Sequence, residues 1–192
     1  MNENEFLNTI FSKANLSKQE KHRVVNSFTK VHFKKNDFIF RESQVVNHYY
    51  YMEEGFARSF TYDFDGNEVS TNFYSLSNII IDWTSFMLRT PTQENFQVNT
   101  DCVCWRLDYT DFQILFNSIE GFRESGRARF AMSYLKLKKK HLSIITNTAK
   151  ERYFLLLQEH PEIINNAPLK HIATYLGITD TSLSRIRKEI ST

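Results

Sequence analysis

Hydroxyl and basic side chains alternate near the end of the chain, between Thr179 and Lys188. An arginine such as Arg185 can bind O6 and N7 of guanine through two hydrogen bonds, which discriminates between bases by about 1–3 kcal/mol. Hydroxyl groups such as those of Thr181 and Ser182 bind base edges or phosphates. These residue types, carried on one helix, predict a surface that reads the major groove of DNA.

The segment Leu169–Lys188 has the pattern of two short helices joined by a tight turn, which would hold these side chains in place. Ala173 lies where the helices must cross closely, and Gly177 lies in the turn, where a left-handed backbone favours glycine. The apolar positions that two crossed helices would share are Ile172, Leu176, Ile178, Leu183 and Ile186. We therefore predict a helix-turn-helix, against the plainer interpretation of an amphipathic helix pair.

The candidate DNA-binding residues combine base contacts with phosphate contacts. Arg185, Thr181 and Ser182 should face outward, and Thr179 should cap the second helix. Lys170, His171, Arg187 and Lys188 are either sequence-neutral phosphate contacts or ordinary surface charges. The full predicted set is Thr179, Asp180, Thr181, Ser182, Ser184, Arg185, Arg187, Lys188, Lys170 and His171.

Charge is divided unevenly along the 192 residues, although the formal net charge is only +2. Residues 1–120 hold 11 basic and 16 acidic side chains, whereas residues 121–192 hold 13 basic and 6 acidic ones. Nucleic-acid affinity depends on neutralising phosphates, so this segregation is typical of a DNA-binding unit joined to a unit with another task.

In the rest of the chain, the spacing of apolar residues changes twice. Residues 5–30 are predicted to be helical, with Ser17 as an N-cap. From Val31 to Leu107, short aromatic and β-branched runs alternate with turn residues, which favours an antiparallel roll or barrel. A short helix from Asp108 or Thr110 to Phe116 follows. The fold class is thus α+β, with a roll in residues 1–120, a long helix in residues 121–150 and a helix-turn-helix unit in residues 151–192.

The long helix predicted from Gly121 to Lys150 has two apolar stripes, one for the roll and one for another surface. That surface is either a partner helix or the interior of a monomer. The partner interpretation gives the predicted dimer interface, which consists of Phe130, Tyr134, Leu137, His141 and Ile144. The run Lys136–Lys140 is read as a solvated face, with proximity to DNA as the alternative.

Composition narrows the remaining functions. No apolar run is long enough to span a membrane, and the polar start of the sequence does not look secretory, so we expect a cytoplasmic protein. Cys102 and Cys104 lie too near in sequence for an ordinary disulfide, and they read as core residues rather than as metal ligands. No metal site, cofactor or catalytic constellation is expected, because His22, His32 and His48 are widely spaced and the glycines form no phosphate loop. The prediction is therefore a protein that is not an enzyme.

In the order of its predicted elements and in its motifs, the chain resembles the Crp/Fnr superfamily of bacterial transcription regulators, which are related to the cyclic-AMP receptor protein. The resemblance is greatest to a short Bacteroidetes-type subgroup. The resemblance covers roughly residues 20–190. It rests on RYFLLLQEHPEI (Arg152–Ile163), PLKHIATYLGIT (Pro168–Thr179) and SLSRIRKEI (Ser182–Ile190), with weaker support from Phe33–Ser43 and Tyr49–Phe60. It implies a cyclic-nucleotide-binding-like sensor roll, a homodimer joined by the long helix, double-stranded DNA as partner and contact with RNA polymerase.

Departures from the family concern its turns and its ligand. Family glycines are replaced by Asn36, which tolerates a left-handed backbone, and by Ser43, which suggests a modified loop. The stretches in place of the phosphate-binding cassette, Ser77–Asp82 and Thr92–Asn95, carry no arginine, and Glu94 would repel a phosphate.

Control by cyclic AMP is therefore not expected, and two cysteines cannot hold an iron–sulfur cluster. Haem ligation by a single histidine remains open. The effector is another small molecule or none, and the weak candidates for binding it are Trp83, Arg89 and Phe96. The predicted function is a sequence-specific DNA-binding regulator. The alternative is a ligand-binding or protein-interaction module that has lost DNA binding.

Overall fold

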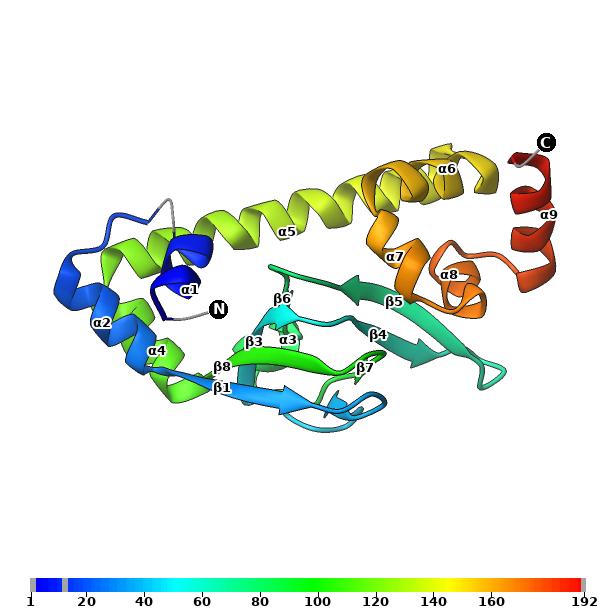
Figure 1. Cartoon of the computed structure of the whole chain (residues 1–192). Coiled ribbons are helices and arrows are strands. Elements are labelled where there is room, and N and C mark those ends of the chain that lie inside the picture. Colours follow the sequence, from blue (N-terminus) through cyan, green and yellow to red (C-terminus); the bar gives the residue numbers. More distant parts are fainter. Residues whose placement is uncertain (1–2, 12–13, 191–192) are drawn as a thin grey trace.

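The roll consists of two antiparallel sheets in the computed structural model, which describes residues 3–11 and 14–190 (Figure 1). Within those residues each sheet has four strands. The first sheet has the order β1 (Phe28–Phe33), β8 (Cys102–Asp108), β3 (His48–Glu54) and β6 (Ile79–Ile80). The second has the order β2 (Phe38–Phe40), β7 (Asn95–Val98), β4 (Ala57–Tyr62) and β5 (Glu68–Tyr74). The predicted antiparallel roll is confirmed.

The interior of the roll is filled by apolar and aromatic side chains from both sheets. Along β8, the side chains of Cys102, Cys104, Trp105 and Leu107 are buried while those of Val103 and Arg106 are partly exposed, so both faces of this strand contribute to the apolar core. Phe96 and Phe40 meet there edge to face, with ring centres 5.3 Å apart. The aromatic runs in the sequence therefore fill the roll.

The N-terminal segment is helical only in part of the predicted range, residues 5–30. It forms α1 (Glu3–Ile10) and α2 (Lys18–Asn26), and Phe28 already belongs to β1, where it pairs with Leu107. Ser17 is the N-cap of α2 as predicted, in a capping box with Glu20. The helical prediction is therefore right for α1 and α2 and wrong for residues 28–30, which belong to β1.

Helices follow the roll in the predicted order. They are α4 (Tyr109–Ser118), α5 (Glu120–Thr146), α6 (Ala149–Glu159), α7 (Pro161–Asn166), α8 (Leu169–Tyr175) and α9 (Asp180–Ile190); α3 (Trp83–Leu88) lies within the roll sequence. The long helix α5 ends at Thr146 rather than at Lys150. The reason is local, because Thr148 and Glu151 form a capping box that starts α6.

Two turns keep a left-handed backbone at the positions where the sequence lacks glycine. Asn36 has φ +74° and Ser43 has φ +68°. Asparagine adopts this conformation at low cost, as predicted, and serine adopts it here as well. The loop at Ser43 is held by a hydrogen bond from its backbone N–H to the carbonyl of Thr92, at 2.8 Å.

Helix α5 runs along the whole molecule, with α1, α2 and α4 near its beginning and α6–α9 near its end (Figure 1). The apolar core divides in the same way. The larger cluster lies in the roll and its adjoining helices. The smaller cluster joins α6–α9, and it also takes in Phe56 and Phe73 of the roll. The C-terminal helices are thus packed against the roll.

No helix in the described part of the chain is both long enough and apolar enough to cross a membrane.

Candidate functional site

Helices α8 and α9 share the small apolar core that their spacing predicts. Ile172, Ala173, Leu183 and Ile186 are buried, with Ala173 completely so, where the two helices cross. Gly177 has φ +68°, and an added Cβ there would touch nothing within 4 Å. Conformation rather than space therefore favours glycine at the turn.

The outer face of α9 exposes the side chains that the sequence marks for DNA contact. Thr181, Ser184, Arg185, Arg187 and Lys188 are exposed, and Ser182 is half-buried. Thr179 accepts a hydrogen bond from the backbone N–H of Ser182, at 3.2 Å, so it caps the helix as predicted. Asp180 lies in the first turn and the basic residues Arg187 and Lys188 lie in the last, which suits the helix dipole.

The two candidate DNA-binding residues on α8 differ in their exposure. Lys170 is exposed, but His171 is 8% exposed and faces the roll, with its Nε2 atom 3.9 Å from Oε2 of Glu68. Neither ring nitrogen of His171 has a hydrogen-bond partner. Burial and the nearby Arg58 guanidinium lower the pKa of His171 to about 4. In this arrangement a neutral His171 belongs to the contact with the roll, and its predicted phosphate contact is not available.

The contact between α8 and the roll lies along β5, the edge strand of the second sheet. The hydroxyl of Thr174 accepts a hydrogen bond from the backbone N–H of Ser70, at 3.1 Å. The ring of Tyr175 packs against that of Phe73, with centres 5.1 Å apart. The helix that precedes the turn is therefore fastened to the roll by both polar and aromatic contacts, which the sequence alone did not reveal.

The predicted dimer stripe on α5 is exposed. Phe130 is 55% exposed and Leu137 is 65% exposed, and Tyr134, His141 and Ile144 are exposed as well. Large apolar side chains rarely remain in water in such a row along one helix. Leu137, His141 and Ile144 also border a broad groove between α5 and the roll.

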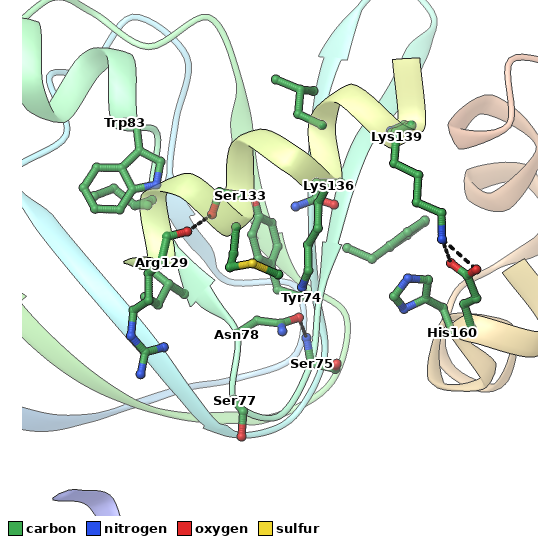
Figure 2. Close-up of a pocket in the computed structure, with 18 of the residues that line it drawn as sticks. Tyr74, Ser75, Ser77, Asn78, Trp83, Arg129, Ser133, Lys136, Lys139 and His160 are labelled. Carbon is green, nitrogen blue, oxygen red and sulfur yellow. Dashed lines mark hydrogen bonds and ion pairs between the residues drawn. The ribbon is translucent and has the colours of Figure 1, made fainter. Parts of the chain in front are cut away.

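That groove has a volume of about 2310 Å³. Figure 2 shows α5 on one side, with Ser133 and Lys136, and the Tyr74–Asn78 segment on the other. A hydrogen bond from the backbone N–H of Ser75 to Oδ1 of Asn78, at 2.9 Å, shapes the turn that forms this second side.

Of the three weak ligand candidates, only Trp83 lines the groove. Phe96 is 1% exposed within the roll core. Arg89 is held elsewhere, because its Nη1 donates to the carbonyl of Val46 at 2.9 Å and its guanidinium lies 4.1 Å from the centre of the Tyr109 ring. Arg89 therefore does not supply the missing phosphate partner.

A cluster of hydroxyl groups and one carboxylate lines part of the groove. Glu94 accepts a hydrogen bond from Thr71, whose hydroxyl lies 2.7 Å from that of Ser59. The Tyr74 hydroxyl lies 3.4 Å from the Ser59 hydroxyl. Burial raises the pKa of Glu94, and it raises the pKa of Tyr74 to about 12. From the sequence, Glu94 was expected only to repel a phosphate.

Lys140 of α5 lines the same groove. Its Nζ donates to the carbonyl of Thr71 at 2.7 Å and lies 3.7 Å from the centre of the Tyr175 ring. Burial lowers the pKa of Lys140 to about 8, against the opposing charge of Glu94. The sequence placed Lys140 on a solvated face. The structure instead puts it where the roll, α5 and α8 meet.

The two cysteines, Cys102 and Cys104, are buried and free. Burial raises the pKa of both thiols, that of Cys104 to about 12, so they stay protonated. Within the described residues, no three histidine, cysteine or acidic side chains gather as a metal site would require.

Comparison with known proteins extends these observations. Residues 30–118 match the family described as cyclic nucleotide-binding domain. No curated protein matches the chain.

Solved structures resemble nearly the whole chain at low sequence identity. The regulator CLP of Xanthomonas campestris, described as c-di-GMP responsive, has a TM-score of 0.72 at 13% identity, over 91% of this chain and 92% of its own. A putative Crp/Fnr-family transcriptional regulator from Eubacterium rectale has a TM-score of 0.72 at 14% identity, over 92% and 84%. FixK2 from Bradyrhizobium japonicum has a TM-score of 0.69 at 18% identity, over 85% and 84%. At these identities the likeness establishes a shared fold.

Proposed function

We propose that the chain is a sequence-specific DNA-binding transcription regulator, because residues 30–118 match the family described as cyclic nucleotide-binding domain and the fold is similar to that of Crp/Fnr regulators. The observation that carries the proposal is α9, which buries Leu183 and Ile186 and exposes Arg185 between them. A helix of this kind can enter the major groove with its polar face toward the bases.

The proposed regulator acts as a homodimer through α5. Two-fold symmetry would present two copies of α9 to the two halves of a near-palindromic site. The proposed division follows the chain, with a sensor in residues 1–120, the dimer helix in residues 121–150 and the DNA-binding unit in residues 151–192. We propose that this regulator acts in the cytoplasm and contacts RNA polymerase as well as DNA. The proposal includes no catalytic activity.

The proposed effector is a small molecule other than a cyclic nucleotide, or the regulator works without one. Glu94 supports this part of the proposal, since a half-buried carboxylate in the position expected for a phosphate clamp opposes an anion.

Selection of duplexes from a random pool, followed by gel shift, tests the DNA-binding proposal. The Arg185→Ala variant should lose about 1–3 kcal/mol for the preferred duplex, because two hydrogen bonds to guanine disappear. Arg185→Lys is the matched control, since it keeps the charge but cannot form the same pair of bonds; it should retain salt-dependent binding and lose sequence preference. Failure to enrich any duplex, with a folded dimer in hand, would favour the alternative of a module without DNA binding.

A further inference from the structure

The carboxylate of Glu94 lies in the groove without a cation beside it. Among the described residues, no ion pair within 4 Å reaches it, and its hydrogen-bond partners are the neutral hydroxyls of Thr71 and Ser59. The hydroxyl of Tyr74 also belongs to the cluster. A half-buried carboxylate held by hydroxyl groups lacks the charged N–H donors that would stabilise it further.

Lys140 is near enough for its charge to act on Glu94, but its ammonium group is bound elsewhere. It is committed to the carbonyl of Thr71 and to the face of the Tyr175 ring. Both ionisable groups line the same groove, and they attract each other without a hydrogen bond or ion pair within 4 Å between them. The space around Glu94 is thus open to a positive group from outside the chain.

We propose that the groove binds a small organic cation, with its ammonium or guanidinium group on Glu94, and that Lys140 relays its arrival to α8 through Tyr175. Such a group would supply N–H donors to Glu94 and to the hydroxyls of Ser59 and Tyr74. An anionic ligand would meet the carboxylate first, which excludes phosphate from the same place.

The relay follows from the position of Lys140 at the junction. A second positive charge near Glu94 repels the Lys140 ammonium and removes the attraction that Glu94 exerted on it. Lys140 then moves away or loses its proton, which its lowered pKa of about 8 makes easy. Either change removes the cation from the Tyr175 ring and weakens the packing of α8 on β5. This second half rests on the proposed function, in which the roll controls the helices that contact DNA.

Calorimetric titration of the full chain tests the site. The probes are n-butylammonium and n-butylguanidinium, with n-butanol and butyrate as neutral and anionic controls of matched shape. We expect saturable binding of the cations, no binding of either control and at least tenfold weaker binding by Glu94→Gln, which keeps the size of the side chain. Glu124→Gln is the matched control variant, because Glu124 is an exposed acid that also lines the groove, and it should bind like the unmodified chain.

The proposal of a site fails if neither cation binds, or if Glu94→Gln binds as tightly as the unmodified chain, which would mark an adventitious surface site. The relay has its own readout, the hydrogen exchange of the Ser70 amide that Thr174 covers. The bound cation should speed that exchange several-fold in the unmodified chain and leave it unchanged in Lys140→Met. Binding without faster exchange would overturn the relay alone. Neither experiment contains DNA, so a failure here is distinct from a failure of Arg185 to read bases.

Discussion

The ammonium nitrogen of Lys140 lies 3.7 Å from the centre of the Tyr175 ring, so one side chain of the long helix α5 touches the helix that precedes α9. The same nitrogen donates to the carbonyl of Thr71 on β5. Three parts of the molecule that are distant in sequence therefore meet at one charge. The ring of Tyr175 also packs on that of Phe73 of β5, so polar and aromatic contacts lie side by side at this junction.

Replacing Tyr175 should loosen this junction. Tyr175→Leu removes the ring that faces Lys140 and Phe73, and we expect the Ser70 amide to exchange about tenfold faster, equal to about 1.4 kcal/mol. Hydrogen exchange read by nuclear magnetic resonance checks the result. Tyr175→Phe keeps the ring and should exchange like the unmodified chain. Equal exchange in Tyr175→Leu would show that the ring does not hold α8 on the roll.

A charge on the exposed stripe of α5 should separate the proposed dimer. Leu137 is 65% exposed, so Leu137→Glu leaves the core of the single chain intact while placing a carboxylate in the proposed interface. Sedimentation at micromolar concentration should show a dimer for the unmodified chain and a monomer for the variant. The neighbouring Lys138→Glu is the control and should remain dimeric. A monomeric unmodified chain contradicts the proposed assembly.

Cyclic AMP should leave the melting temperature unchanged up to millimolar concentration. The loop Thr92–Asn95 presents Glu94 in place of a phosphate partner, and Arg89 is bound to the carbonyl of Val46. A ligand that binds only the folded state raises stability with concentration, so thermal unfolding with increasing nucleotide is a direct check. A saturable upward shift would mean that another cation in the groove, such as Lys136, takes over the phosphate.

His171 should make the fold sensitive to acid. Its pKa is about 4 in the folded chain, against an ordinary value of 6.5, so between these values the unfolded chain binds more protons. This contribution to stability is complete above about pH 6.5 and decreases as the pH falls toward 4. Urea unfolding at several pH values should show a shallower decrease in that window for His171→Asn. The exposed His160→Gln is the control and should keep the original slope; an unchanged slope in His171→Asn would contradict the assignment.

Local patterns were sufficient to predict much of the fold. The turn at Gly177 and the cap at Ser17 depend on residues within a few positions of each other, and both are confirmed. The end of α5 was placed a few residues too late, although the capping box at Thr148 that ends it is also local.

The parts that sequence reasoning missed depend on long-range packing. Phe28 continues an apolar spacing that looks helical, but its pairing with Leu107 across the sheet makes it a strand residue. Lys140 stands in a run of lysines that suggests solvent, and only the packing of α5 on the roll brings it to Glu94 and Tyr175. The sequence suggests that His171 is an exposed basic residue, but the packing of α8 on β5 buries it near Glu68. The division of charge along the chain carried no information about these three contacts.

Covering β5 has a consequence for the solution behaviour of the chain. An open strand edge invites pairing with strands of other molecules, which leads to aggregation. Thr174 and Lys140 occupy the backbone N–H of Ser70 and the carbonyl of Thr71 on that edge. Any event that lifts α8 from the roll also exposes a template for intermolecular pairing. A form with β5 uncovered is therefore expected to aggregate faster as the protein concentration rises.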